Sequence, residues 1–284
     1  MNNDMERLVA LLGDPVGHSL SPAMHNAAFR HLGIGMHYMA FKVPVGAFDE
    51  AVCGLFALGA SGANVTVPHK EAAFRISDTL SPSAEKAGAV NTLIFSQGGI
   101  EGHNTDIYGV RKAVSRICNR RNSALVLGAG GAARSVVCAL AEENFPLIYI
   151  MNRTREKAEA LKEDLATACN NAEIADLSWG DFPEDFIDLF VNTTSLGLDS
   201  NPWPQGLVLH FLESLETLSV LDMVYSRKGQ TSLVEEALRR NLHAINGEEV
   251  LIQQGMAAFE LFTGKAAPEE IMREALKREK EIQS

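Results

Sequence analysis

Polar side chains that suit the binding and oxidation of a hydroxylated compound gather in the first half of the chain. Asn64 and Thr66 lie in one short apolar segment, and Lys70 follows it after a proline that stiffens the turn. Asn91 and Asp106 belong to two later Asn-Thr motifs. In open α/β sheets the carboxyl ends of the strands face the binding crevice, so we expect these groups in one region. Amides and hydroxyls there would bind a polyol, while the lysine and the aspartate would handle a proton.

Two serine hydroxyls, those of Ser19 and Ser21, come just before a predicted helix that has Pro22 in its first turn. Hydroxyls in such a position can bind a carboxylate. Ser21 also suits simple helix capping, because a serine followed by a proline is a common start of a helix. The residues by themselves leave both interpretations open.

A glycine-rich turn follows an apolar segment in the second half of the chain and fits the dinucleotide fingerprint G-x-G-x-x-G/A. Its first glycine permits the tight turn, its second lets the backbone approach a pyrophosphate, and Ala133 allows close packing of helix on strand. The N–H groups that begin the next helix would point at the phosphates. We expect the phosphates to be held by Gly128, Ala129, Gly130, Gly131 and Ala132.

The end of the following strand favours NADP over NAD. A site for NAD usually offers a carboxylate there to the ribose 2′-hydroxyl, whereas this chain has Asn152 and Arg153. A guanidinium can grip a 2′-phosphate through paired bonds, Thr154 can donate to the same phosphate, and Lys157 adds a charge one helical turn on. The alternative is a solvated, basic start of a helix.

Strand-like and helix-like segments alternate along the chain, which predicts an α/β fold, and 284 residues exceed the usual size of one core. In the first half we expect helices from residue 21 and over 48–58, and strands over 7–12, 36–41, 62–67, 91–95 and 99–103. A second series predicts strands over 123–127, 147–151, 187–191 and 219–223, and helices over 106–118, 132–143, 154–168 and 231–240. Two helices, over 250–262 and 268–281, follow that series.

Composition excludes several classes of protein. The net charge of −11 argues against a nucleic-acid binder, which needs basic surface. The sequence shows no membrane-length apolar run and no signal-peptide pattern. Four widely spaced cysteines without a C-x-x-C motif, and eight histidines without an H-E-x-x-H motif, argue against disulfides and a metal site. We therefore expect a cytoplasmic protein.

Several motifs together resemble those of the shikimate dehydrogenase family, which includes quinate-using members. The similarity covers nearly the whole chain, and spaced motifs in the family's order are more specific than any one of them. The matching segments are 19–22, 64–70, 88–92, 102–106, 128–132 and 253–255, with Phe259.

The resemblance implies two α/β domains: a substrate-binding and catalytic domain over 1–106 plus 247–284, and a Rossmann-type NADP-binding domain over 107–246. The C-terminal helices would return to the first domain. The implied activity is the reversible NADPH-dependent reduction of 3-dehydroshikimate to shikimate, a step toward chorismate and the aromatic amino acids.

The resemblance also implies roles for single residues. Lys70 and Asp106 would be the catalytic pair, and it stays open whether Lys70 acts alone on the proton. The two serines described above would hold the substrate carboxylate. The other implied substrate contacts are Thr66, Asn91 and Gln253 at ring hydroxyls, Asn64 in support, and Tyr225 from the cofactor domain. For the NADP 2′-phosphate the implied residues are Arg153 and Thr154, with Asn152 beside them.

Three positions depart from the family pattern. Ser226-Arg227-Lys228-Gly229 lacks the proline that is common after the Tyr225 position, Phe262 stands where tryptophan is common, and Thr193 where alanine is common. These changes concern the geometry of loops near the nicotinamide and spare the catalytic pair.

Two alternatives stay open from the sequence. One is a quinate or dual quinate/shikimate dehydrogenase that uses NAD, because nothing in the sequence excludes the extra hydroxyl of quinate. The other is a non-enzymatic protein that binds a dinucleotide and senses a metabolite, against which the intact Lys70 and Asp106 count. The sequence leaves open whether the protein is a monomer or a homodimer.

Overall fold

The computed structural model describes residues 6–17, 19–183, 186–198, 201–204, 206–214, 217–226 and 229–283. The chain divides into two compact units. Unit 1 contains the chain up to Thr105 together with the chain from Gln254 onward, and unit 2 runs from Asp106 to Gln253. Among the described helices, none combines the length and apolar character needed to cross a membrane.

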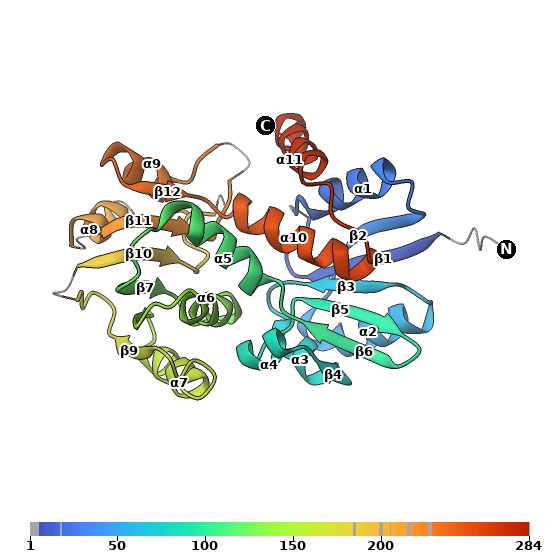
Figure 1. Cartoon of the computed structure of the whole chain (residues 1–284), viewed down its shortest axis with the longest axis horizontal. Coiled ribbons are helices and arrows are strands. Elements are labelled where there is room, and N and C mark those ends of the chain that lie inside the picture. The colour runs from blue at the N-terminus through green and yellow to red at the C-terminus, as the bar shows by residue number, and fades with distance from the viewer. Residues whose placement is uncertain are drawn as a thin grey trace. The chain divides into compact units, whose positions relative to one another are not determined.

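Unit 1 is built on a mixed six-stranded sheet with the order β2-β1-β3-β5-β6-β4 (Figure 1). β1 is parallel to β2 and β3, whereas β5 and β6 form a hairpin that is antiparallel to β3 through β5. The strands are β1 (Arg7–Gly13), β2 (Met36–Lys42), β3 (Gly62–Val65), β4 (Thr79–Leu80), β5 (Thr92–Ser96) and β6 (Gly99–His103). The last five residues of β1 are buried, as expected for a strand covered on both faces.

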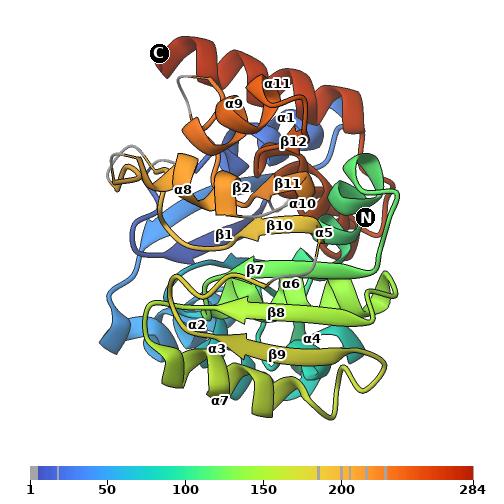
Figure 2. The same ribbon diagram turned by 90° about the vertical axis from the view of Figure 1, so that its left-hand side faces the viewer.

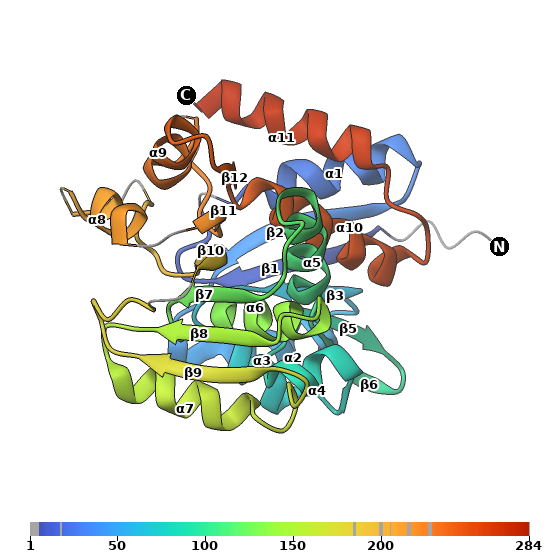
Figure 3. The ribbon, with the colours of Figure 1, turned by 60° about the vertical axis from the view of Figure 1, so that its left-hand side comes forward.

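Helices cover this sheet. They are α1 (Ser21–His31), α2 (Phe48–Ala57), α3 (Lys70–Ile76), α4 (Pro82–Ala87), part of α10 (Glu248–Thr263) and α11 (Glu269–Gln283). α11 packs along α1, and Figure 3 shows the two helices side by side. The return of the last helices to unit 1 confirms the architecture predicted from the sequence.

Unit 2 has a fully parallel sheet. Its strand order is β12-β11-β10-β7-β8-β9, which Figure 2 shows from top to bottom. Counted within the unit, this is the 3-2-1-4-5-6 order of a Rossmann fold. The strands are β7 (Ser123–Leu127), β8 (Leu147–Met151), β9 (Glu173–Leu177), β10 (Ile187–Asn192), β11 (Thr217–Asp222) and β12 (His243–Ile245). The helices are α5 (Asp106–Ile117), α6 (Gly131–Glu142), α7 (Arg155–Leu165), α8 (Leu207–Ser214) and α9 (Ser232–Arg239).

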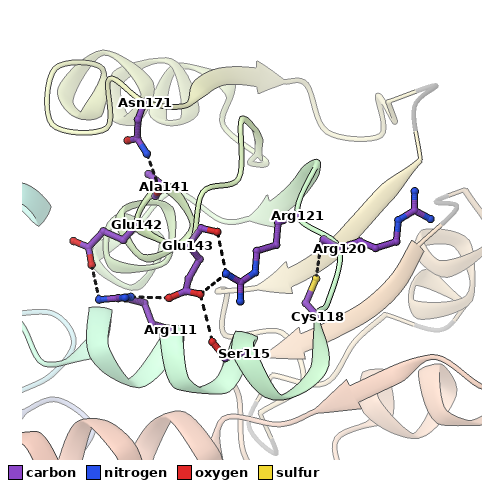
Figure 4. A network of polar contacts seen from close by, with 9 residues as sticks. All are labelled: Arg111, Ser115, Cys118, Arg120, Arg121, Ala141, Glu142, Glu143 and Asn171. Carbon is purple, nitrogen blue, oxygen red and sulfur yellow. Dashed lines mark hydrogen bonds and ion pairs between the residues drawn. The ribbon is translucent and has the colours of Figure 1, made fainter.

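A buried carboxylate fastens α5 to α6. Glu143, which directly follows α6, accepts bonds from Arg111 Nε at 2.8 Å and from Ser115 Oγ at 3.4 Å, both on α5. Arg121 Nη1 reaches the same carboxylate at 2.8 Å and the Glu143 carbonyl at 3.2 Å (Figure 4). Because α5 leads into β7 through Arg121, this cluster fixes the helix against the strand that precedes the glycine-rich turn.

Candidate active site

Asn64 in β3 is engaged through both atoms of its side-chain amide. Tyr38 Oη in β2 donates to Asn64 Oδ1 at 2.8 Å. Asn64 Nδ2 donates to Thr92 Oγ1 at 2.9 Å and to the Asn91 carbonyl at 3.2 Å. The antiparallel register pairs Asn64 with Thr92, which explains how β5 reaches it. Asn64 therefore ties three strands together, which suits the supporting role that the resemblance implies for it.

Asn91, at the entrance to β5, is held just as firmly. Its Oδ1 accepts from the Thr105 backbone N–H at 2.8 Å and from Thr92 Oγ1 at 3.1 Å. Its Nδ2 donates to Thr105 Oγ1 at 3.0 Å and lies 3.5 Å from Gln254 Oε1 on α10. Thr105 and Gln254 were not predicted as site residues, although both stand inside the motifs that carry the resemblance.

These contacts form one buried cluster, which we name the amide network. It consists of Tyr38, Asn64, Asn91, Thr92, Thr105 and Gln254. In a purely parallel sheet only the carboxyl ends of strands meet at one edge. The antiparallel β5 brings its start to that edge as well, so the network joins residues from five separate segments: β2, β3, the start of β5, the segment after β6, and α10.

Thr66 and Lys70 follow β3 at the same edge. A Cβ on Gly13 would lie 2.3 Å from Thr66 Cγ2, so the glycine lets the two loops approach closely. His69 is buried, its Nε2 lies 2.7 Å from the Val43 carbonyl, and its ring stacks on Phe48. This fixed histidine immediately precedes Lys70, the half-buried first residue of α3.

The start of α1 differs from the expected cap. Ser21 is the first helical residue rather than the cap, and the residue at the N-cap, Leu20, makes no side-chain bond. Instead Ser19 Oγ accepts from the Ser21 backbone N–H at 3.2 Å. The expectation of a Ser21 cap is therefore wrong, because the helix begins one residue earlier than the Ser-Pro pattern indicates. The Ser21 hydroxyl therefore does not cap α1.

One turn into α1 lies an unusual histidine. His25 is fully buried, and neither ring nitrogen has a hydrogen-bond partner among the described residues. Its ring stacks on that of Tyr38 with centroids 4.4 Å apart and planes 3° apart, and Phe29 and Phe259 lie around it. Burial lowers the pKa of His25 to about 3, so the ring is neutral. It thus packs against the tyrosine whose hydroxyl holds Asn64.

The remaining predicted substrate and catalytic residues lie in unit 2. Asp106 is buried and begins α5, and Tyr225 is half-buried in the segment after β11. Gln253 in α10 is buried and donates to Glu249 Oε1 at 2.9 Å. Of the segment in which the family proline is missing, Arg227 and Lys228 lie outside the described residues.

The glycine-rich turn has the geometry that a dinucleotide phosphate needs. Gly128 adopts a φ of +113°, and a Cβ there would lie 2.5 Å from Thr193 Oγ1. Gly130 is the N-cap of α6, and no side chain at this position caps the helix. The space that a Cβ on Gly130 would occupy is open. The first N–H groups of this twelve-residue helix are therefore left for an anion such as a pyrophosphate.

Basic and hydroxyl groups stand at the end of β8. Arg153, Thr154 and Lys157 are exposed, and Asn152 Nδ2 donates to the Thr154 carbonyl at 2.8 Å. Thr154 occupies the N-cap of α7 without a side-chain cap bond, so its hydroxyl is not used by the helix. This donor set fits a 2′-phosphate. Within the described part of the chain, no three His, Cys, Asp or Glu side chains are grouped to hold a metal ion.

Sequence models of three family domains match the chain. The shikimate dehydrogenase substrate binding domain matches residues 11–93, the shikimate / quinate 5-dehydrogenase domain matches 111–179, and the shikimate 5′-dehydrogenase C-terminal domain matches 247–277. The first two matches fall on the two units separately.

Curated and solved relatives agree with these matches. A "Shikimate dehydrogenase (NADP(+))" of Methanopyrus kandleri is 43% identical over 275 residues, covering 95% of this chain and 94% of the relative. A crystal structure of a shikimate dehydrogenase in complex with NADP+ superposes with a TM-score of 0.86 at 35% identity, covering 98% and 97% of the two chains. The Thermus thermophilus enzyme in complex with shikimate gives 0.82 at 35% identity, covering 97% and 99%. With this identity over nearly its full length, the chain belongs to the shikimate dehydrogenase family.

Proposed function

We propose that this protein is an NADP-dependent shikimate dehydrogenase, which reversibly reduces 3-dehydroshikimate to shikimate. The observation that carries the proposal is the amide network beside Thr66 and Lys70, a buried array of amides and hydroxyls at one edge of the unit 1 sheet. Such groups suit a ring with several hydroxyls. The names and bound molecules of the relatives support the same substrate and cofactor.

Each end of the substrate has a matching group on the chain. Ser19 and Ser21 would bind the carboxylate, and the position of Ser21 inside the first turn of α1 adds helix N–H groups that favour an anion. Thr66, Asn91 and Gln253 would bind ring hydroxyls, and Tyr225 would contact the ring from unit 2. Asn64 would act indirectly, because both atoms of its amide already serve Tyr38 and Thr92.

When bound, NADP supplies or accepts the hydride. The chain must then hold the carbinol in place and move the hydroxyl proton. Lys70 would lie at that hydroxyl as proton carrier or fixed cation, and Asp106 would orient it. Gly128, Ala129, Gly130, Gly131 and Ala132 would hold the pyrophosphate, and Arg153, Thr154 and Lys157, with Asn152 beside them, the 2′-phosphate. Unit 1 would thus be the substrate domain and unit 2 the cofactor domain.

Initial rates with shikimate and with quinate, each measured with NADP and with NAD, test the proposal. We expect shikimate with NADP to give the highest kcat/KM, at least about tenfold above shikimate with NAD, because one bond to a charged group contributes about 1.5–3 kcal/mol. Equal kcat/KM for the two cofactors, or a preference for quinate with NAD, would favour the quinate dehydrogenase alternative. No turnover of either acid would favour a sensor.

A further inference from the structure

A buried carboxylate lies where β11 ends, and sequence reasoning gave it no role. Asp222 is fully buried and accepts three bonds: from Thr231 Oγ1 at 2.6 Å, from Asn192 Nδ2 at 2.8 Å and from the Val224 backbone N–H at 3.1 Å. None of these partners carries a charge. Burial raises the pKa of Asp222 to about 6, so the ionised form is held at a cost to stability.

Asn192, one of these three partners, is the last residue of β10 and hydrogen-bonds to the loop that follows it. Its Oδ1 accepts from the N–H and the hydroxyl of Thr194, at 3.1 and 2.7 Å, and its Nδ2 also reaches the Leu196 carbonyl at 2.9 Å. This loop is anchored independently on its other side. Thr193 donates to the Leu127 carbonyl through its N–H at 2.9 Å and its hydroxyl at 2.8 Å, directly before Gly128.

The other two partners fix the segment that carries Tyr225. The bond from Val224 to Asp222 closes the turn after β11, and the Met223 N–H donates to the Asn192 carbonyl at 2.9 Å. Thr231, which caps α9, donates to the same carboxylate. The two oxygens of Asp222 thus serve three donors, which come from the end of β10, from Val224 next to Tyr225 and from the start of α9.

We propose that Asp222 is a positioning residue, which places Tyr225 for its contact with the substrate through bonds to Asn192, Val224 and Thr231. The inference rests on the proposed function, because Tyr225 is a substrate contact only there. Asp222 is itself buried and acts through these three partners. The phosphate turn does not depend on Asp222, since Thr193 holds it through bonds of its own.

Asp222→Ala removes the acceptor for all three donors. We expect KM for shikimate to rise about tenfold or more, the equivalent of one lost bond to a charged group, with the NADP dissociation constant within about threefold. Asp222→Asn keeps one acceptor oxygen, so KM should rise by a smaller factor than in Asp222→Ala. If Asp222→Ala does not fold, Thr231→Val removes one donor and must raise KM in the same direction by a smaller factor.

Asp188 provides the matched control. It is equally buried, lies at the opposite end of β10, and accepts from the Asn122 N–H at 2.6 Å. Asp188→Ala should lower stability yet leave KM for shikimate unchanged, which separates positioning from folding.

A double-mutant cycle with Tyr225→Phe tests whether Asp222 affects KM for shikimate through the Tyr225 hydroxyl. If Asp222 acts through the tyrosine hydroxyl, Asp222→Ala should change KM little further in the Tyr225→Phe background. The inference would be overturned if the KM increases of the two single variants multiplied in the double variant, or if Asp222→Ala left KM unchanged. Failure of the unmodified enzyme to oxidise shikimate with NADP would instead overturn the proposed function.

Discussion

Arg153 and Arg155 stand two positions apart, yet the structure gives them different environments. Arg155 is paired with Asp176 at 3.2 Å and with Glu159 at 3.0 Å, and its Nη1 lies 3.3 Å from Ser178 Oγ. Arg153 lies exposed beside the unused hydroxyl of Thr154. We therefore expect Arg153, rather than the paired Arg155, to bind the 2′-phosphate.

Arg153→Ala should lower kcat/KM for NADP by about 10- to 100-fold, because it removes a charge-assisted bond, and should leave kcat/KM for NAD nearly unchanged. Arg155→Ala is the control and should preserve the ratio of the two cofactors. Steady-state rates at two salt concentrations give the measurement, since added salt should weaken NADP more than NAD. Equal losses with both cofactors would place the 2′-phosphate elsewhere.

His25 makes stability depend on pH. Its pKa is lowered from 6.5 to about 3 in the folded protein. As the pH falls, His25 of the unfolded chain is therefore protonated near pH 6.5, whereas His25 of the folded chain stays neutral until about pH 3. The neutral ring is fully compatible with the fold above pH 6.5, and stability falls as the pH drops from 6.5 toward 3. The total is roughly 5 kcal/mol, at about 1.36 kcal/mol per unit.

Urea unfolding at about pH 7.5, 6.5, 5.5 and 4.5 measures this dependence against His25→Phe. Phenylalanine keeps a ring between Tyr38 and Phe29 and loses no hydrogen bond, because the imidazole makes none with the described residues. The unmodified protein should lose more stability on acidification than the variant. Parallel curves would show that His25 is not neutral in the fold.

At the residue scale the sequence predicted which side chains gather, but not what they touch. Asn64, Asn91 and Thr66 were expected near strand ends, and they are there. Their partners Tyr38 and Thr105 depend on the register of β2 and of the β5–β6 hairpin, which no local pattern specifies. Asp222 did leave a signal, a carboxylate that directly follows the apolar pair Val220 and Leu221 in the predicted strand over 219–223.

At the scale of elements, the helices α5 and α6 are joined by ion pairs to the buried carboxylate of Glu143. Its carboxylate is nearly buried and joins α5 to α6 through Arg111 and Arg121, whereas the neighbouring Glu142 is more exposed and reaches only Arg111 among the contacts drawn (Figure 4).

Glu143→Gln should lower the free energy of unfolding by roughly 2 kcal/mol, because two bonds between charged groups lose a charge. Glu142→Gln should change it by about 0.5 kcal/mol or less, because the Glu142 carboxylate is more exposed to water than that of Glu143. Chemical denaturation compares the two variants, and both should keep the KM of the unmodified enzyme. A similar small loss in both would mean that burial adds nothing to the Glu143 pairs.

The accuracy of the predicted elements followed their burial. The strand predicted over 123–127 is β7, with all five residues buried, and the strand over 147–151 is β8. β9, β12 and α8 were not predicted. β9 and β12 are edge strands with few buried residues, so their apolar pattern is weak. α8 follows a Pro-rich segment that carries loop signals.

Across the whole molecule, the residues proposed for chemistry are divided between two units. Lys70 belongs to unit 1, whereas the glycine-rich turn and Arg153 belong to unit 2. A change at Lys70 should therefore leave the binding of NADP by unit 2 intact. The expectations that the protein binds no nucleic acid and is cytoplasmic stay predictions, and whether it is a monomer or a homodimer stays open.

Lys70→Ala tests this division of labour. We expect kcat to fall by at least roughly 100-fold, the lower range for lost acid–base catalysis, while the dissociation constant of NADP stays unchanged. Lys42→Ala is the control, because it removes another lysine of unit 1, an exposed one that pairs with Asp14 at 3.4 Å. Near-normal kcat in Lys70→Ala would exclude the lysine from the proton transfer.

The β5–β6 hairpin also offers a place to extend the protein. Its five-residue strands run from the amide network to the tip at Ser96–Gly99, a span of about 17 Å at about 3.4 Å per residue. Gly98 at the tip has open space around it apart from Ser96 Oγ. Loop tips of this kind accept inserted sequence, whereas the opposite end of the hairpin is hydrogen-bonded in the amide network. A tag or a fluorescent-dye acceptor peptide placed after Gly98 would therefore report on the enzyme without slowing it.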